Sequence, residues 1–348
     1  RARQPGSARA GSRAGAGRLS AFGDEEWLRG LPKAETHCHL ECTSPALTAE
    51  LAARRGGPVP VLAAGAPFAD LFPFLDASAD LIATEDEASE VAHAVAERAS
   101  VSGVRHLEII MNVSHWRRRW DGRLPQLVGA LCDGFDRAED EGLASGHLSM
   151  SVLRASGADR AEELVRQLVR IGRPRVVALS IDGDESAAGF TGRRFAAAFR
   201  RARTAGLRTV AHTGESGGAA HVRDTLAHLA PDRIDHGFRV LEEPALARAV
   251  ARARIPLALC PSANVDLGWV PSIDTHPIER LRRLGAHVSV NTDAPWTYVL
   301  WEEYARCRDA FDWPRTVVKD LARNAIDASF ATPARKAELL RELERHPV

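Results

Sequence analysis

Six polar residues of the sequence are of types that bind metal ions or move protons: His37, His39, His212, Glu215, His236 and Asp293. His37 and His39 are separated by a single residue, so on a β-strand both imidazoles would point to the same face. Taken singly, a strand histidine is usually a structural residue held by hydrogen bonds, and an aspartate after a strand is usually a helix N-cap. As a set, histidines and a carboxylate are typical ligands of a divalent metal ion.

The chemistry of such a set is hydrolytic. Three imidazoles and one carboxylate suit a borderline ion such as zinc and leave a coordination position for water. The ion lowers the pKa of its water from about 15.7 towards roughly 7 and so generates hydroxide at neutral pH. Glu215 follows His212 by three residues and could donate a proton beside the metal. These residues predict one Zn²⁺ per chain.

Short apolar stretches would carry these residues as strands, and there are eight of them: 34–41, 103–112, 147–154, 175–183, 208–215, 233–240, 255–264 and 287–295. They alternate with amphipathic stretches such as 159–172 and 193–206, which end in glycine as helices do. The alternation predicts an α/β fold, a (β/α)8 TIM barrel with its chemistry at the C-terminal strand ends. An open doubly wound sheet is the alternative, but the sequence lacks the patterns G-x-G-x-x-G and G-x-x-x-x-G-K-[ST].

Two segments lie outside this alternation. Roughly residues 45–102 are long for one crossover, and we expect extra helices there, over the C-terminal mouth of the barrel. Residues 1–22 begin with 18 residues that hold five arginines and no acid, and their low complexity predicts a disordered arm. Residues 23–348 would then form a single metal-dependent hydrolase domain.

Composition limits the classes of partner. The chain has 46 basic and 46 acidic residues, which argues against a nucleic-acid or membrane-surface protein, although the arginine-rich arm leaves a nucleic-acid-binding tail as an alternative. The five cysteines are scattered and suggest no disulfide framework, so we expect a reducing, cytoplasmic compartment. We expect a small-molecule substrate and no membrane partner, and the oligomeric state stays open.

Five motifs occur in order between about residues 31 and 330: LPKAETHCHLE, SIDGDE, AHTGE, RIDHGFRV and SVNTDAP. Together they resemble the adenosine deaminase family of the amidohydrolase superfamily. The resemblance implies that zinc is held by His37, His39, His212 and Asp293, and that Asp293 also takes the proton of the attacking water.

The resemblance also implies roles for residues around the metal. His236 would orient the attacking hydroxide, and Glu215 would protonate the ring nitrogen next to the carbon under attack. The backbone N–H of Gly183 would bind another ring nitrogen, and Glu41 would lie near the sugar end of the substrate.

Three positions depart from the family pattern. Ala294 replaces a second aspartate that binds the purine, and Cys42 replaces a glycine. Asn112 ends a second strand of unusual sequence, and we expect it to contact the substrate in the same pocket as Ala294. We therefore expect catalysis on an altered substrate.

The prediction is a zinc-dependent deaminase that releases ammonia from an aminopurine nucleoside or a related amino-heterocycle, and that is not a standard adenosine deaminase. Two alternatives remain open at this point. One is an amidohydrolase acting on another C–N bond of a non-purine substrate, and the other is a non-catalytic ligand-binding relative.

Overall fold

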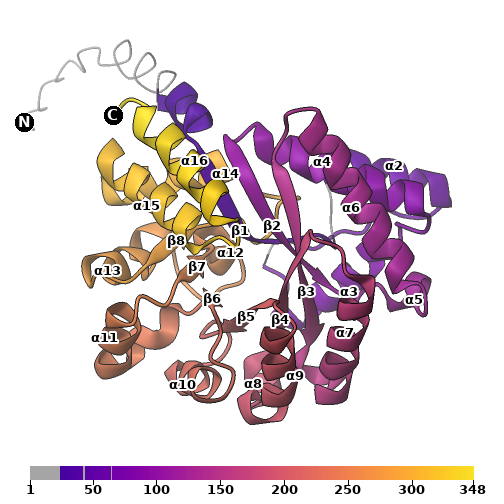
Figure 1. Ribbon diagram of the computed structural model, residues 1–348. Helices are drawn as coiled ribbons and strands as arrows, with labels where there is room; N and C mark the ends of the chain where they lie inside the picture. Colours follow the sequence, from indigo (N-terminus) through magenta and orange to yellow (C-terminus); the bar gives the residue numbers. More distant parts are fainter. Residues whose placement is uncertain (1–23, 42–43, 64) are drawn as a thin grey trace, which may run out of the picture.

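The computed structural model describes residues 24–41, 44–63 and 65–348, so the expected arm over residues 1–22 and Cys42 lie outside the described part of the chain. Parallel strands follow one another around one sheet in chain order (Figure 1). They are β1 (Lys33–His39), β2 (Val104–Asn112), β3 (Ser145–Leu153), β4 (Val176–Asp182), β5 (Arg208–Thr213), β6 (Arg233–His236), β7 (Leu257–Leu259) and β8 (Val288–Val290). A parallel bridge between Cys38 and Asp293 joins the segment after β8 to β1. The predicted (β/α)8 TIM barrel is confirmed.

Three strands, β6, β7 and β8, are much shorter than the sequence predicted, and β8 ends at Val290 rather than at residue 295. β6 ends at His236 rather than at residue 240, because Gly237 adopts a left-handed φ of 73° and the chain continues as the 3-10 helix η2 (Phe238–Glu242). β7 ends at Leu259 rather than at residue 264, because Pro261 begins helix α12 (Pro261–Asp266). His236 is therefore the last residue of its strand and lies at the rim of the barrel.

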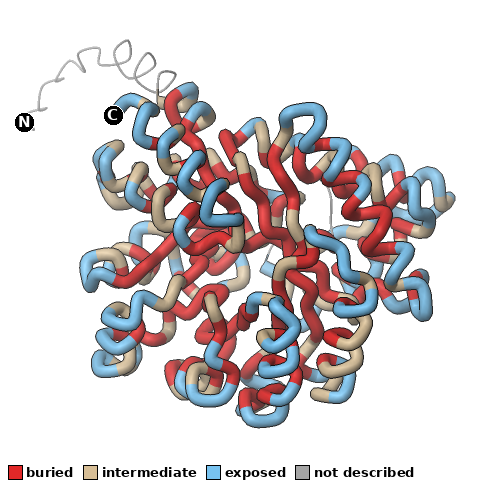
Figure 2. Tube along the Cα trace, in the orientation of Figure 1, coloured by how far each residue is buried: buried red, intermediate tan, exposed pale blue. Residues whose placement is uncertain are grey.

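An outer layer of helices surrounds the strands (Figure 1). It comprises α6 (Leu124–Asp140), α7 (Ala158–Ile171), α9 (Gly192–Thr204), α10 (Ala219–His228), α11 (Pro244–Arg252), α13 (Ile278–Arg283), α14 (Leu300–Phe311), α15 (Arg315–Ala328) and α16 (Pro333–Arg345), with the short α5 (Arg117–Trp120) and α8 (Glu185–Ala188) at strand ends. In α7 the buried residues Ala161, Leu164 and Leu168 recur at helical spacing, and Gly172 ends the helix with a φ of 61°. Buried residues accordingly follow the strands and the inner helix faces (Figure 2).

The long segment after β1 forms three helices, α2 (Pro45–Arg55), α3 (Phe68–Ala79) and α4 (Glu85–Ser100). α2 and α3 contribute side chains such as Thr48 and Phe72 to the wall of a cavity at the C-terminal mouth, as expected. α4 instead packs against α6 and β2, so it belongs to the outer layer. Among the described helices, none has the length and apolar character needed to cross a membrane.

Candidate active site

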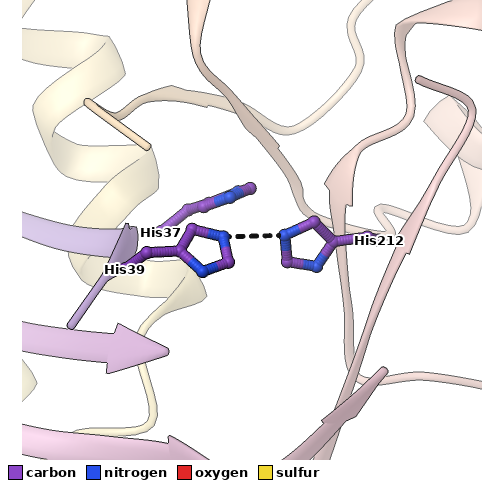
Figure 3. A group of neighbouring side chains, drawn as sticks. All are labelled: His37, His39 and His212. Atoms are coloured by element: carbon purple, nitrogen blue, oxygen red, sulfur yellow. Dashed lines mark hydrogen bonds between the residues drawn. The ribbon is translucent and has the colours of Figure 1, made fainter. Parts of the chain in front are cut away.

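The four expected metal ligands come together where β1, β5 and β8 end. His37 and His39 extend from β1 and face His212 of β5 (Figure 3). The Nε2 atoms of His39 and His212 are 3.2 Å apart. Asp293 follows β8 and places Oδ1 3.2 Å from His37 Nε2 and 3.4 Å from His39 Nε2. One ring nitrogen from each of the three histidines lies within 4.8 Å of the other two, and the Asp293 carboxylate lies beside two of them.

These distances fit a tetrahedral zinc site. Zinc lies about 2.0–2.2 Å from imidazole nitrogen and carboxylate oxygen, so neighbouring corners of its tetrahedron are about 3.3–3.5 Å apart. Both ring nitrogens of His37 are buried and have no hydrogen-bond partner among the described residues. Because buried polar atoms are rarely left without a partner, a cation at this centre would explain the arrangement.

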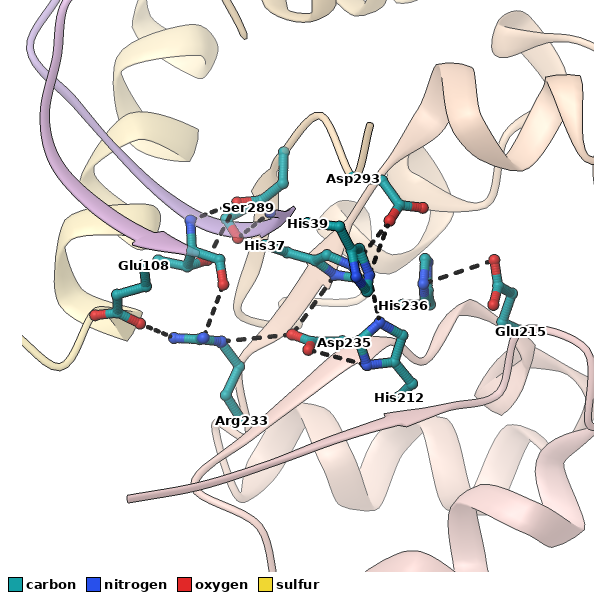
Figure 4. A network of polar contacts seen from close by, with 12 residues as sticks. His37, His39, Glu108, His212, Glu215, Arg233, Asp235, His236, Ser289 and Asp293 are labelled. Carbon is teal, nitrogen blue, oxygen red and sulfur yellow. Dashed lines mark hydrogen bonds and ion pairs between the residues drawn. The ribbon is translucent and has the colours of Figure 1, made fainter. Parts of the chain in front are cut away.

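The second ring nitrogen of His37, His39 and His212 faces a buried carboxylate in each case. Figure 4 shows Asp235 between His37 and His212. Asp235 places its two oxygens 3.6 Å from His37 Nδ1 and 3.3 Å from His212 Nδ1. Glu41 Oε2 lies 3.5 Å from His39 Nδ1. A carboxylate behind a metal-binding histidine fixes the orientation and tautomer of the ring. No role was predicted for Asp235, although it directly precedes the candidate residue His236 in the motif RIDH.

Two residues of the site have a left-handed backbone that is unusual outside glycine. His236 has a φ of 62° and Asp293 a φ of 64°. Such conformations cost about 1–3 kcal/mol and concentrate at functional sites, where the surrounding structure enforces them. Here the Asp293 amide donates to the carbonyl of His37 at 3.1 Å, and this bond fixes the turn that directs the carboxylate to the metal ligands.

Glu215 lies beside His236, with 3.6 Å between Oε1 and Nε2 (Figure 4). Glu185, the first residue of α8, holds the loop that carries it. The Glu185 carboxylate accepts hydrogen bonds from Thr213 Oγ1 at 2.6 Å, from the Gly214 amide at 3.0 Å and from the Glu215 amide at 3.1 Å. No role was predicted for Glu185, although it ends the motif SIDGDE.

The surroundings of Glu215 and Asp293 favour opposite protonation states of these two carboxyl groups. Burial raises the pKa of Glu215 well above its ordinary value, and the charges of Asp293 and Glu185 raise it further. Burial also disfavours the charged form of Asp293, but the charge of the adjacent His37 outweighs it and lowers the pKa of Asp293 below its usual range. Pairs of carboxyls with separated pKa values can act as acid and base in one reaction.

The site forms the floor of a cavity of about 510 Å³ at the C-terminal mouth. The outer wall is mostly apolar and includes Val61, Phe68, Phe72 and Trp296. No lysine or arginine is found among the described residues that line this cavity, whereas several carboxylates are. Its size is in the range of pockets that enclose small molecules, about 300–1,000 Å³.

Two of the four expected substrate contacts line the cavity, and these are Gly183 and Ala294. Gly183 follows β4 with a φ of 96°, and a Cβ there would approach a Leu153 methyl group to 3.2 Å. Glycine therefore keeps this stretch of backbone accessible from the cavity. Ala294 packs with Cys260 and Tyr298 and presents only a methyl group.

The other two expected contacts, Glu41 and Asn112, are fully buried and are absent from the described cavity lining. Glu41 accepts hydrogen bonds from the backbone N–H of Asn112 and from Trp116 Nε1, and it also faces His39. The Asn112 side chain donates to Asp182, which does line the cavity. The structure thus places both residues behind the wall, where they support His39 and Asp182.

Comparison with known proteins covers nearly the whole chain. The family model described as Adenosine deaminase matches residues 32–346. An adenine deaminase of Rhodopseudomonas palustris is 33% identical over 339 residues, which is 93% of this chain and 98% of the relative. The crystal structure of an adenine deaminase from Arthrobacter aurescens is 30% identical, with a TM-score of 0.83 over 90% of this chain and 98% of that one.

A zinc-bound amidohydrolase from Burkholderia ambifaria is also similar. It is 25% identical, with a TM-score of 0.81 over 92% of this chain and 93% of that one. The family model spans most of the barrel, and the relatives are hydrolases that act on C–N bonds. The resemblance seen in the five sequence motifs is thus confirmed. This chain belongs to the adenosine deaminase family of the amidohydrolase superfamily and is an enzyme that hydrolyses C–N bonds.

Proposed function

We propose that the enzyme is a zinc-dependent deaminase that removes the exocyclic amine of adenine or of a close, uncharged aminopurine. The observation that carries this proposal is that three histidines within reach of one ion, Asp293 beside two of them, and the acid Glu215 meet at the floor of one cavity. The adenine deaminases among the relatives support a purine base as the substrate class. A non-catalytic ligand-binding protein would have no use for a buried carboxyl whose pKa is raised.

Zinc held by the three histidines and Asp293 would supply a water molecule of near-neutral pKa as the nucleophile. Its oxygen would bond to the ring carbon that carries the amine. Glu215 gives its proton to the adjacent ring nitrogen, which makes the carbon electrophilic before attack. Asp293 would accept one proton of the water and pass it to the amine, so that the carbon–nitrogen bond breaks and ammonia leaves. The second water proton would return to Glu215 as the ring carbonyl forms.

Two further groups would stabilise the reacting atoms. An N–H of His236 would donate to the attacking oxygen while negative charge develops there. The backbone N–H of Gly183, which is accessible from the cavity, would donate to a second ring nitrogen.

The charged residues that line the cavity favour an uncharged substrate. A phosphate group would meet several carboxylates and, among the described lining residues, no lysine or arginine. The Ala294 methyl group offers no acceptor to a purine, but Tyr298, whose hydroxyl donates to Asp266, packs beside it. Tyr298 and Asp266 line the same cavity, so polar atoms are available at that end of a ligand.

The test is ammonia release by the zinc-loaded wild-type enzyme from adenine, adenosine, AMP and cytosine. We expect the highest kcat/KM with adenine and the lowest purine activity with AMP. A preference for cytosine would replace the purine assignment with a non-purine one. Absence of ammonia from every compound, with zinc bound, would contradict the proposed deamination.

A further inference from the structure

Asn264, the fourth residue of α12, connects the two residues to which proton chemistry is assigned above. It is fully buried, and its Nδ2 atom lies 3.4 Å from Glu215 Oε1 and 3.3 Å from His236 Nδ1. On its other side, Asn264 Oδ1 lies 3.2 Å from Nε2 of the buried His276. A single amide group thus contacts two residues of the site and one histidine outside the cavity lining.

The direction of these hydrogen bonds is determined at His276. The backbone N–H of Ile278 donates to His276 Nδ1 at 3.1 Å, so this nitrogen carries no proton. Burial lowers the pKa of His276 to about 3, so the ring is neutral and its one proton is on Nε2. His276 Nε2 therefore donates to Asn264, and the atom of Asn264 that faces it must be the oxygen.

The orientation of the amide then sets the bonds on its other side. The NH₂ group of Asn264 can only donate, so His236 Nδ1 must accept. A neutral His236 ring then carries its proton on Nε2, the nitrogen that lies 3.6 Å from Glu215 Oε1. Glu215 Oε1 is likewise an acceptor of the amide, which leaves Oε2 as the oxygen that carries the acid proton.

We propose that Asn264, oriented by His276, is a positioning residue that sets which nitrogen of His236 and which oxygen of Glu215 carries a proton. This inference rests on the functions proposed above for Glu215 and His236. In this arrangement His236 presents an N–H donor to the attacking oxygen, and Glu215 presents its O–H to the ring nitrogen. Both groups then start the reaction in the required protonation pattern.

The first test is the substitution Asn264→Leu, which keeps the branched shape of the side chain and removes its two donors. We expect kcat for adenine to fall about 10²-fold, since positioned acid–base groups contribute about 10²–10⁴-fold, while KM and zinc content change little. The control is Asn324→Leu, which removes a donor to the Val288 carbonyl at 3.0 Å on the outer side of β8 and should leave kcat unchanged.

His276 offers a matched pair of variants. His276→Gln keeps a donor at the position of Nε2 and should retain most of kcat, whereas His276→Leu has none and should resemble Asn264→Leu. Ring-nitrogen NMR of the zinc-loaded wild type provides a readout that does not depend on turnover. We expect His236, identified by the signal lost in His236→Asn, to be protonated on Nε2.

Three results would overturn the inference: a wild-type His236 protonated on Nδ1, an Asn264→Leu enzyme with the wild-type kcat, or loss of zinc from that variant in proportion to kcat. The last would make Asn264 a structural residue only. If no compound of the panel is deaminated, the proposed function fails, whereas the ring-nitrogen spectra still show which His236 nitrogen carries the proton.

Discussion

The Nε2 atoms of His39 and His212 lie 3.2 Å apart, although the two residues are 173 positions apart in the chain. The barrel explains this, because β1 and β5 run in parallel and their C-terminal ends meet at the same mouth. Two imidazoles that direct the same ring nitrogen at one point, with Asp293 Oδ1 3.4 Å from His39 Nε2, are arranged as ligands of a shared cation.

Replacing His39 with alanine should remove both metal and activity. Wild-type enzyme should contain about one zinc per chain by elemental analysis, and His39→Ala should contain much less, because a tetrahedral site then lacks one ligand. The control is His93→Ala, since His93 pairs with Glu141 at 2.8 Å away from the mouth. The site assignment would be wrong if wild-type protein contained no transition metal and added zinc produced no activity.

Asp235→Asn should weaken zinc binding without removing a ligand. Asp235 faces Nδ1 of both His37 and His212, and loss of such a supporting carboxylate typically costs 10–100-fold in metal affinity or activity. Competition with a chelator of known affinity measures the change. Asp232→Asn serves as the control, because its carboxylate binds Thr209 instead. Equal zinc affinity in wild type and Asp235→Asn would remove Asp235 from the site.

Glu215→Gln should retain zinc and lose most of its turnover. The amide preserves the shape of the side chain but has no proton to transfer, so kcat should fall by about 10²–10⁴-fold. Ammonia release and zinc content are measured on the same preparation. A variant with near wild-type turnover would exclude Glu215 as the proton donor.

The pH profile should show the raised pKa of Glu215 directly. Burial raises this pKa, with further contributions from Asp293 and Glu185. The active form is the protonated one, so kcat/KM should be maintained below the raised pKa and should fall as pH increases through it. Glu185→Gln removes one of the neighbouring negative charges and should shift this alkaline limb to lower pH. If the alkaline limb stays in place or moves to higher pH in this variant, the limb reports the titration of a group other than Glu215.

Ala294 should make the wild-type enzyme a poor adenosine deaminase. Its methyl group cannot hydrogen-bond a purine nitrogen, and a lost buried hydrogen bond costs about 1–3 kcal/mol. We expect kcat/KM for adenosine to lie below about 10⁶ M⁻¹s⁻¹ and to increase about tenfold in Ala294→Asp, which corresponds to about 1.4 kcal/mol. Ala294→Val adds bulk without a carboxylate and controls for packing. Wild-type efficiency at or above about 10⁶ M⁻¹s⁻¹ would contradict this prediction.

Local patterns in the sequence determined the barrel and the set of metal-ligand candidates. Alternating apolar and amphipathic stretches indicate parallel strands joined by helices, and a closed parallel barrel brings all C-terminal strand ends together. The two-residue periodicity of a strand is also sufficient to place His37 and His39 on one face. β6 ends before Gly237 and β7 ends before Pro261, and both residues can be read in the sequence. Because apolar residues continue past both positions, the sequence predicted longer strands.

Only the tertiary structure decided which buried polar side chain contacts and supports each residue of the site. Glu41 was expected near the substrate, yet it is buried and faces His39, while Asp235 supports His37 and Asn264 contacts His236. These partners come from different strands and loops, and their meeting depends on strand register and loop path. Local periodicity specifies the face of one strand but not the residue that lies opposite on another, because that choice is made by packing across the whole barrel.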